Sequence, residues 1–189
     1  NIKINNVTEA MEQMIADGIT EVIVQPTHVI NGIENDLMKE DALAFKNHFV
    51  RITFGDPLLT RQQDHVEIVN AICQEFSDLP SDCALILMGH GTSHYANDVY
   101  AALDYRFKDL GHDNIHLATV EGYPTLENVI RLVKEQGAKK VILTPFMIVA
   151  GDHARNDMSG EDEDSWKNQL QAAGYEVECC LKGLGEYPA

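Results

Sequence analysis

The sequence predicts an α/β protein made of two βαβ lobes, each built on a parallel sheet. Short apolar runs rich in Val, Ile and Leu alternate along the chain with segments of helical periodicity. The runs are continuously apolar, which is typical of strands buried on both faces of a parallel sheet. Because both halves of the chain repeat this pattern, a cleft between two lobes is expected.

The first lobe is expected over residues 1–80. Thr8 can cap a first helix that continues to about Asp17 and ends at Gly18. Strands are expected at residues 20–26 and 50–54, and helices at 34–47 and 61–77. The polar stretch LPSD at 79–82 separates this lobe from the next.

The second lobe is expected over residues 81–189. Its strands are expected at residues 83–89, 115–121, from 139 toward 149, and at 175–181. Its helices are expected at residues 96–110, 126–136 and 161–173. Gly137 closes the middle helix, because a helix commonly ends where glycine takes a left-handed conformation.

The charge of the chain argues against a nucleic-acid partner. Fourteen Lys and Arg stand against 30 Asp and Glu, a net charge of −16, whereas nucleic acid requires clustered cations. The acidic balance is compatible with the attraction of metal cations. No apolar run is long enough for a membrane-spanning helix, so no membrane partner is expected. A homo-oligomer stays open.

The four cysteines predict a reducing compartment. They form no CxxC pair, and two of them are adjacent in an apolar stretch. We interpret them as reduced core residues, with thiolate metal ligation as the alternative. The cytoplasm is therefore expected. The periplasm stays open as an alternative because the N-terminus NIKINNVTEA has no initiator Met and looks trimmed.

Each of four predicted strands is followed by a titratable polar residue. His28, His90, Glu121 and His153 each follow such a strand, and the carboxyl ends of parallel strands share one edge of a sheet. His90, Glu121 and His153 come from one lobe and can converge there. His28 would face them from the other lobe and contact the substrate there.

Two imidazoles and a carboxylate are suitable ligands for a divalent first-row metal ion. The same groups can accept protons near neutral pH. Gly89 and Gly91 flank His90, and glycine lets a backbone and a ligand approach each other closely. The sequence therefore predicts a metal or proton-transfer site around His90, with both glycines in contact with a substrate.

Other interpretations of these residues stay open. Each histidine could be a hydrogen-bonded structural residue, and Glu121 could cap the helix that follows GYPT. The turn GHGTS could hold a phosphate, although it lacks the lysine of a P-loop, and no GxSxG elbow marks a serine nucleophile. No role is assigned to four further histidines, namely His48, His65, His112 and His116.

Several motifs in order resemble one family. MGHGTSH, VEGYP, MIVAGDHARNDM, EDSWK and GLGEYPA, together with VQPTHVINGIE and GDPLL in the first half, resemble the sirohydrochlorin cobaltochelatases of the anaerobic cobalamin pathway. These are two-lobed members of the class II chelatase family, akin in fold to ferrochelatase. The resemblance covers nearly the whole chain and implies two Rossmann-like, chelatase-like lobes.

The resemblance also implies a reaction and its residues. Co²⁺, the substrate metal, would enter sirohydrochlorin with release of two protons, and no organic cofactor is implied. By motif, His90, Glu121 and His153 would hold the metal, and His90 would take pyrrole protons. A nickel or ferrochelatase, a tetrapyrrole or metal carrier and a phosphate-binding module are the alternatives.

Two features of the family are missing from the sequence. The opening strand with its SFGT-like loop and a C-terminal helix are absent, so we expect an internal piece of a longer protein whose first lobe lacks its opening strand. The substrate carries eight carboxylates, which require local cations in so acidic a chain. Arg155 is the best candidate for a carboxylate partner, ahead of Arg106 and Lys167.

Overall fold

The computed structural model describes residues 4–187 and divides the chain into two units, with the division between Thr60 and Arg61. The strand pairs of both units are parallel, as the apolar runs predicted. The last two residues of the GLGEYPA motif lie outside the described part. The N-terminal unit extends up to Thr60, and the C-terminal unit begins at Arg61.

The division falls earlier than the boundary expected after residue 80. Helix α3 (Gln62–Glu75) belongs to the C-terminal unit, where it lies against α4 (Asp98–Asp109). Val69 and Ile72 of its apolar stripe are almost completely buried, whereas Val66 is 39% exposed. The stripe that predicted this helix therefore packs within the C-terminal unit and not with the preceding strands.

The N-terminal unit is a two-stranded parallel sheet with two helices. Its elements are α1 (Val7–Ala16), β1 (Glu21–Val24), α2 (Ile33–Leu43) and β2 (Arg51–Phe54), with a short 3₁₀ turn at Lys46–His48. Its buried apolar residues are Met11, Val22, Ala42 and Phe49. Ile23 points away from this core and is 78% exposed.

Helix α1 is capped by Asn6 and not by Thr8. The Asn6 side chain accepts a hydrogen bond from the Glu9 amide at 2.8 Å, and the Glu9 carboxylate accepts one from the Asn6 amide at 3.1 Å. This reciprocal pair satisfies two amides that a helix start leaves unpaired. Gly18 follows the helix with a φ of +72°, as expected for its end.

The C-terminal unit is a four-stranded parallel sheet in the order β4-β3-β5-β6. Besides α3 and α4 its elements are β3 (Cys83–Gly89), β4 (Ile115–Thr119), α5 (Leu126–Gln136), β5 (Lys140–Pro145), α6 (Trp166–Ala172) and β6 (Glu176–Cys179). Short turns occur at Tyr95–Asn97, Ala154–Met158 and Leu184–Glu186. The turn around Ala154–Met158 was not expected, and α6 begins later than predicted because Ser165 caps it.

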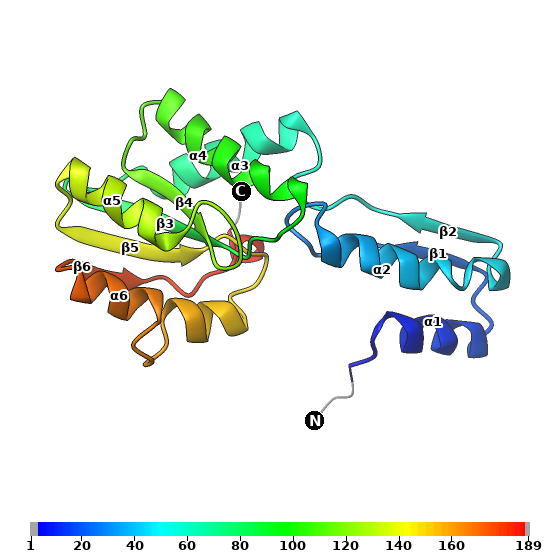
Figure 1. Cartoon of the computed structure of the whole chain (residues 1–189). Coiled ribbons are helices and arrows are strands. Elements are labelled where there is room, and N and C mark those ends of the chain that lie inside the picture. The colour runs from blue at the N-terminus through cyan, green and yellow to red at the C-terminus, as the bar shows by residue number, and fades with distance from the viewer. Residues whose placement is uncertain (1–3, 188–189) are drawn as a thin grey trace. The chain divides into compact units, whose positions relative to one another are not determined.

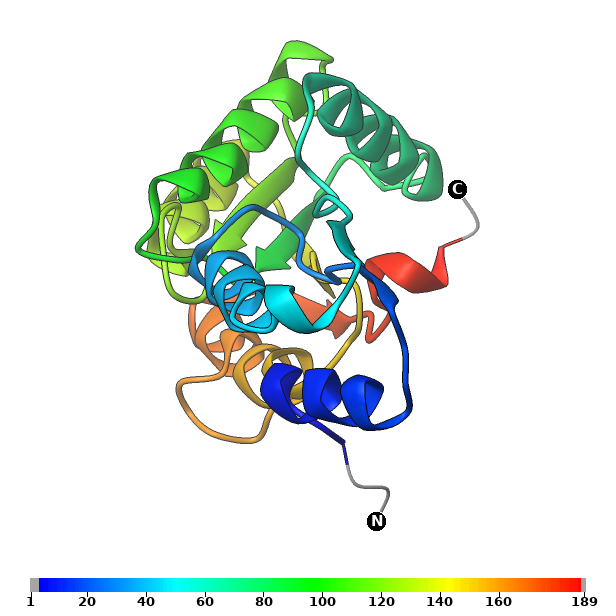
Figure 2. The same ribbon diagram turned by 90° about the vertical axis from the view of Figure 1, so that its right-hand side faces the viewer.

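Helices cover both faces of this sheet. All seven residues of β3 are buried, as a central strand covered on both sides requires. Residues of β3 and β5 on one face share a core with α5 and α6, and α4 packs on the other side against β4. Figure 1 shows α3 and α4 together on one side and α6 on the opposite side, and Figure 2 shows the same separation from the carboxyl ends of the strands.

The strand order creates a switch point between β3 and β5. The chain leaves β3 for its neighbour β4 and then returns past β3 to β5. The loops that follow β3 and β5 therefore depart toward opposite faces of the sheet. In open α/β sheets, ligands bind beyond the carboxyl ends of strands at such a point.

The four cysteines form no disulfide, and Cys83 alone among them is fully buried. Burial raises the pKa of the Cys73, Cys83 and Cys179 thiols, so they remain protonated near neutral pH. Within residues 4–187, no helix has both the length and the apolar character needed to cross a membrane.

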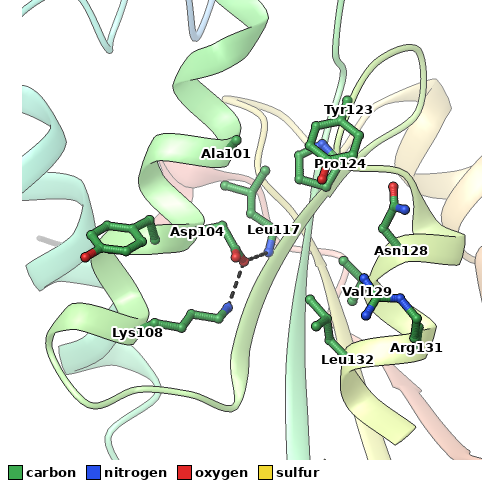
Figure 3. A pocket seen from close by; sticks show the side chains of 11 residues that line it. Ala101, Asp104, Lys108, Leu117, Tyr123, Pro124, Asn128, Val129, Arg131 and Leu132 are labelled. Atoms are coloured by element: carbon green, nitrogen blue, oxygen red, sulfur yellow. Dashed lines mark hydrogen bonds and ion pairs between the residues drawn. The ribbon is translucent and has the colours of Figure 1, made fainter. Parts of the chain in front are cut away.

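Side chains of α4 close the outer edge of strand β4. Asp104 accepts hydrogen bonds from the Leu117 amide and from the Lys108 ammonium, both at 2.8 Å. Lys108 also donates to the Ile115 carbonyl. Figure 3 shows these groups at the floor of a pocket of about 240 Å³ between α4 and α5. An edge strand satisfied in this way offers fewer groups for pairing with another strand.

His116, for which the sequence indicated no role, completes this cluster. Its side chain is fully buried, with Nε2 at 2.9 Å from Oε1 of Gln136 and Nδ1 at 3.3 Å from Nζ of Lys108. Lys108 can only donate, so Nδ1 accepts and the ring is neutral with its proton on Nε2. Burial first, and then the charge of Lys108, lower the pKa of His116.

We expect His116→Gln to flatten the loss of stability that accompanies acidification. The unfolded chain takes up a proton on this residue near the ordinary histidine pKa of about 6.5, whereas the folded protein resists it. The neutral ring therefore contributes fully to the free energy of unfolding above that pH, and this contribution is lost as the pH falls below it. Urea unfolding at several pH values, followed by the fluorescence of the single tryptophan Trp166, measures this slope.

The matched control is His112→Gln, which removes a part-exposed imidazole from the loop before β4 and should retain the wild-type slope. If the unfolding free energy of His116→Gln fell with acidification as steeply as that of the wild type, the assignment would be contradicted.

Candidate functional site

His90, Glu121 and His153 lie together at the carboxyl edge of the four-stranded sheet. His90 follows β3, Glu121 lies just beyond β4, and His153 lies in the turn after β5. Nε2 of His90 is 3.8 Å from Oε1 of Glu121, and the His90 and His153 ring centroids are 4.7 Å apart. The two histidine side chains are about one-third exposed and that of Glu121 is 56% exposed. The sequence-based expectation that these side chains converge agrees with this geometry, and their role as metal ligands stays a prediction.

The His90 and Glu121 backbones continue the pairing of the two strands. The Val120 amide donates to the Gly89 carbonyl at 3.1 Å, and the Glu121 amide donates to the His90 carbonyl at 2.9 Å. The two side chains therefore start from neighbouring rungs of one ladder. Glu121 does not cap α5, because Thr125 and Asn128 form the capping box of that helix.

The glycines on either side of His90 make room for the protein itself. A Cβ on Gly89 would lie 2.6 Å from the Tyr100 ring. Gly91 has a φ of +82°, and its Cβ would lie 2.7 Å from the Gly122 nitrogen. Glycines beside His90 predict space for a bound ligand. In the structure neighbouring residues occupy it, and contact of either glycine with a substrate stays a prediction.

His153 stands at the start of a π-helical turn whose buried residues anchor it. Ala154 and Met158 are fully buried in the core. Nδ1 of His153 lies 2.5 Å from Oδ2 of Asp157, one turn further along. A carboxylate only accepts, so Nδ1 carries the proton and the Nε2 lone pair is left for another partner. Metal-binding histidines are commonly oriented by a carboxylate in this way.

Asp157 was missed in the sequence analysis. Its four-residue spacing from His153 was the available signal, because residues at that spacing meet on one helix face. The expected loop between β5 and the next helix concealed it, since no helical turn was predicted there.

The three donors do not form a closed metal cage as they stand. Within residues 4–187, no group of three or more His, Cys, Asp or Glu side chains is arranged to hold a metal ion. Ligands of one ion lie only about 2.0–2.2 Å from it, so Glu121 would have to move closer to His90 to share an ion. The exposed Glu121 side chain has room for that rotation.

The three cations that the sequence offered as carboxylate partners differ in what they contact. Arg155 is exposed, and no hydrogen bond or ion pair of its guanidinium occurs within the described part of the chain. Arg106 donates to Gln62 on α3, and Lys167 donates to the Ser159 carbonyl at 3.4 Å. Arg155 is therefore the cation of this set that is available to a ligand.

His28 belongs to the N-terminal unit. Its Nδ1 is buried and has no hydrogen-bond partner among residues 4–187. The loop that carries it is held by a hydrogen bond from the Leu58 amide to the His28 carbonyl at 3.1 Å. Its predicted place opposite His90 stays a prediction.

The GHGTS turn differs from a phosphate-binding loop. A short 3₁₀ turn separates it from α4, and the Thr92 amide donates to Asn97 at 3.0 Å. The His94 amide donates to the Thr92 hydroxyl at 3.2 Å. Because these amides are already bound, they are not available to a phosphate.

Known proteins match the chain over its whole length. A family model described as cobalt chelatase (CbiK) matches residues 1–189. A sirohydrochlorin cobaltochelatase of Salmonella typhimurium is 37% identical over 188 residues, which are 100% of this chain and 71% of that protein. The sirohydrochlorin cobaltochelatase CbiKC of Nitratidesulfovibrio vulgaris is 34% identical over 191 residues, covering 98% of this chain and 66% of its own length.

Solved structures share the fold. The sirohydrochlorin chelatase SirB of Bacillus subtilis subspecies spizizenii, in complex with cobalt, superposes with a TM-score of 0.59 at 16% identity, covering 100% of this chain and 72% of its own. SirB of Bacillus subtilis with Fe³⁺ gives a TM-score of 0.62 at 16% identity and is covered to 74%. The predicted chelatase-like α/β fold is thus confirmed.

We expect Gly91→Ala to destabilise the C-terminal unit more than Gly111→Ala. Both glycines have a φ near +82°, but a Cβ on Gly111 would meet nothing within 4 Å. Gly111→Ala should cost about 1–2 kcal/mol of unfolding free energy from the left-handed backbone alone. Gly91→Ala should cost about 1–3 kcal/mol more because its Cβ overlaps neighbouring atoms. Urea unfolding followed by Trp166 fluorescence measures both, and equal losses would contradict the packing role of Gly91.

Proposed function

Because the chain belongs to the cobalt chelatase (CbiK) family, we propose that it inserts Co²⁺ into sirohydrochlorin as a step of cobalamin biosynthesis. The macrocycle loses two pyrrole protons and gains one divalent ion, so charge and atoms balance. The observation that carries the proposal is the convergence of His90, Glu121 and His153 at the switch point of the sheet.

The donor set suits the capture of the ion. Imidazole nitrogen and carboxylate oxygen are ligands for first-row divalent metals, and His153 offers Nε2 because Asp157 holds its Nδ1 proton. Fe²⁺ and Ni²⁺ suit the same ligands, so the preference for Co²⁺ rests on the family. The partly exposed position lets a large planar substrate reach the ion.

The same residues suit the removal of protons. A general base is most effective when its ordinary pKa lies near the pH of the reaction, and imidazole is such a group near neutral pH. We assign His90 as the main acceptor. Glu121 is 3.8 Å from its Nε2, so a small movement would let the carboxylate take the proton onward. His153, which Asp157 orients, is assigned to holding the ion.

Binding of the substrate requires local positive charge. Sirohydrochlorin carries many carboxylates, whereas this chain has a net charge of −16. Arg155 lies two residues after His153 and has an available guanidinium, which can bind a carboxylate through two parallel hydrogen bonds. We therefore propose that Arg155 binds a peripheral carboxylate of the substrate.

We expect His90→Ala to lose cobalt insertion by at least about 100-fold, because general base catalysis contributes roughly that much or more. The measurement is the absorbance time course of sirohydrochlorin with Co²⁺. His112→Ala, which removes a histidine of the same unit far along the chain from the site, should retain the rate. Insertion at the wild-type rate by His90→Ala would overturn the assignment. Stoichiometric binding without turnover by the wild type would favour a carrier instead.

We expect Arg155→Ala to weaken sirohydrochlorin binding at low salt by about tenfold, since a hydrogen bond to a charged group contributes about 1.5–3 kcal/mol. Fluorescence or absorbance titration without metal gives the Kd, and the difference should shrink at high salt. The control is Arg131→Ala, which removes an exposed arginine that is paired with Glu135 on α5. Unchanged affinity in Arg155→Ala would exclude its role.

A further inference from the structure

One buried side chain joins the loop that carries His90 to the loop that carries Glu121. Oδ1 of Asn97 accepts a hydrogen bond from the Thr92 amide at 3.0 Å, and its Nδ2 donates to the Tyr123 carbonyl at 2.7 Å. Asn97 is only 8% exposed. The bond to Thr92 is buried and that to Tyr123 is part-buried, so together they constrain the two loops.

The two contacts are placed symmetrically about the site. Thr92 lies two residues after His90, and Tyr123 lies two residues after Glu121. On the strand side, the Glu121 amide already donates to the His90 carbonyl at 2.9 Å. The His90–Glu121 pair is therefore held from both sides, by the backbone ladder on one and by Asn97 on the other.

The position of Asn97 in its helix makes this use of its side chain informative. Asn97 occupies the N-cap position of α4, where asparagine commonly bonds to its own helix. Its side chain makes no such capping bond. Both polar atoms are committed to the loops instead, so helix capping does not account for the residue.

Gly122 fits against the same side chain. A Cβ at position 122 would lie 2.3 Å from Oδ1 of Asn97, and the buried amide cannot withdraw without losing its hydrogen bonds. The residue after Glu121 is thus pressed directly against Asn97. The side chain controls the Glu121 loop by contact as well as by hydrogen bonding.

We propose that Asn97 is a positioning residue that fixes the separation of His90 and Glu121 and thereby sets the affinity of the site for the metal ion. This inference rests on the proposed function for the identity of the ion. Within residues 4–187 no hydrogen bond joins Asn97 to either of the two side chains, and it acts through Thr92 and Tyr123.

The test compares Asn97→Ala with Asn114→Ala. Asn114 donates to the Cys83 carbonyl at 3.1 Å and so ties β4 to β3 at the opposite end of the same two strands. Each variant loses side-chain hydrogen bonding at one end of this strand pair, but only Asn97→Ala does so at the site. Titration of each protein with Co²⁺, followed by its visible absorption without tetrapyrrole, gives the metal Kd. We expect about 10–100-fold weaker binding for Asn97→Ala, the range found when groups that orient metal ligands are removed. Asn114→Ala should bind Co²⁺ as the wild type does.

A double-mutant cycle with Glu121→Ala separates positioning from general destabilisation. If Asn97 acts by placing Glu121, Asn97→Ala should weaken Co²⁺ binding little further once Glu121 is gone. Full additivity of the two changes, or equal effects of Asn97→Ala and Asn114→Ala, would overturn the inference.

Two further measurements keep the test decisive. Should Asn97→Ala fail to fold, Asn97→Asp keeps the acceptor for the Thr92 amide but replaces the donor to Tyr123 with a charged acceptor. It should still weaken Co²⁺ binding, although the added negative charge alone would favour a cation. Gly122→Ala places a Cβ against the Asn97 side chain and should also weaken Co²⁺ binding. If the wild type binds Co²⁺ but inserts none, the proposed function fails while the inference stands on the Kd values. If the wild type inserts cobalt and Asn97→Asp and Gly122→Ala both retain its Co²⁺ affinity, the inference fails alone.

Discussion

The pairing of strand β3 with β4 on one side and β5 on the other is the constraint on which the site depends. The parallel register sets Gly89 opposite Thr119 and Met88 opposite Pro145, so the three strands end at nearly the same height. Every side chain of β3 is buried, and a shift of one residue would turn each of them to the other face of the sheet. The core therefore holds the register, and the register holds the loops that carry the polar residues.

Much of this arrangement could be predicted because it follows from local pattern. The apolar run at 83–89 and the helix at 126–136 with Gly137 behind it have the bounds that the sequence indicated. The convergence of His90 and Glu121 followed from parallel strands alone. Strand order could not be predicted, since the apolar runs look alike and nothing local records which run lies beside which. For the same reason the placement of α3 with the C-terminal unit was not expected.

The residues missed at the site share one cause. Asp157 meets His153 only because an unexpected helical turn forms there, and Asn97 meets Tyr123 only in the folded chain. From the sequence alone each has an ordinary explanation, a loop carboxylate and a helix cap. Their roles follow from what their polar atoms contact: Asp157 holds Nδ1 of His153, and Asn97 forgoes its own helix to bind two other loops. The residue types in the sequence cannot distinguish an asparagine that caps its own helix from one that joins two loops by hydrogen bonds.

The histidines of the C-terminal unit show how partners distinguish a structural ring from a reactive one. Both nitrogens of His116 are bound within the protein, and the buried ring closes the cluster at the edge of β4. His153 has Nδ1 bound and Nε2 left over, whereas His90 lies 3.8 Å from the Glu121 carboxylate and beside the His153 ring. Because the space beside Gly89 and Gly91 is filled by the protein, the unbound ring nitrogens mark the side from which an ion and its macrocycle can approach. Incomplete pairing at an exposed strand end, more than the presence of histidine, is what supports the proposal that this edge is the reactive one.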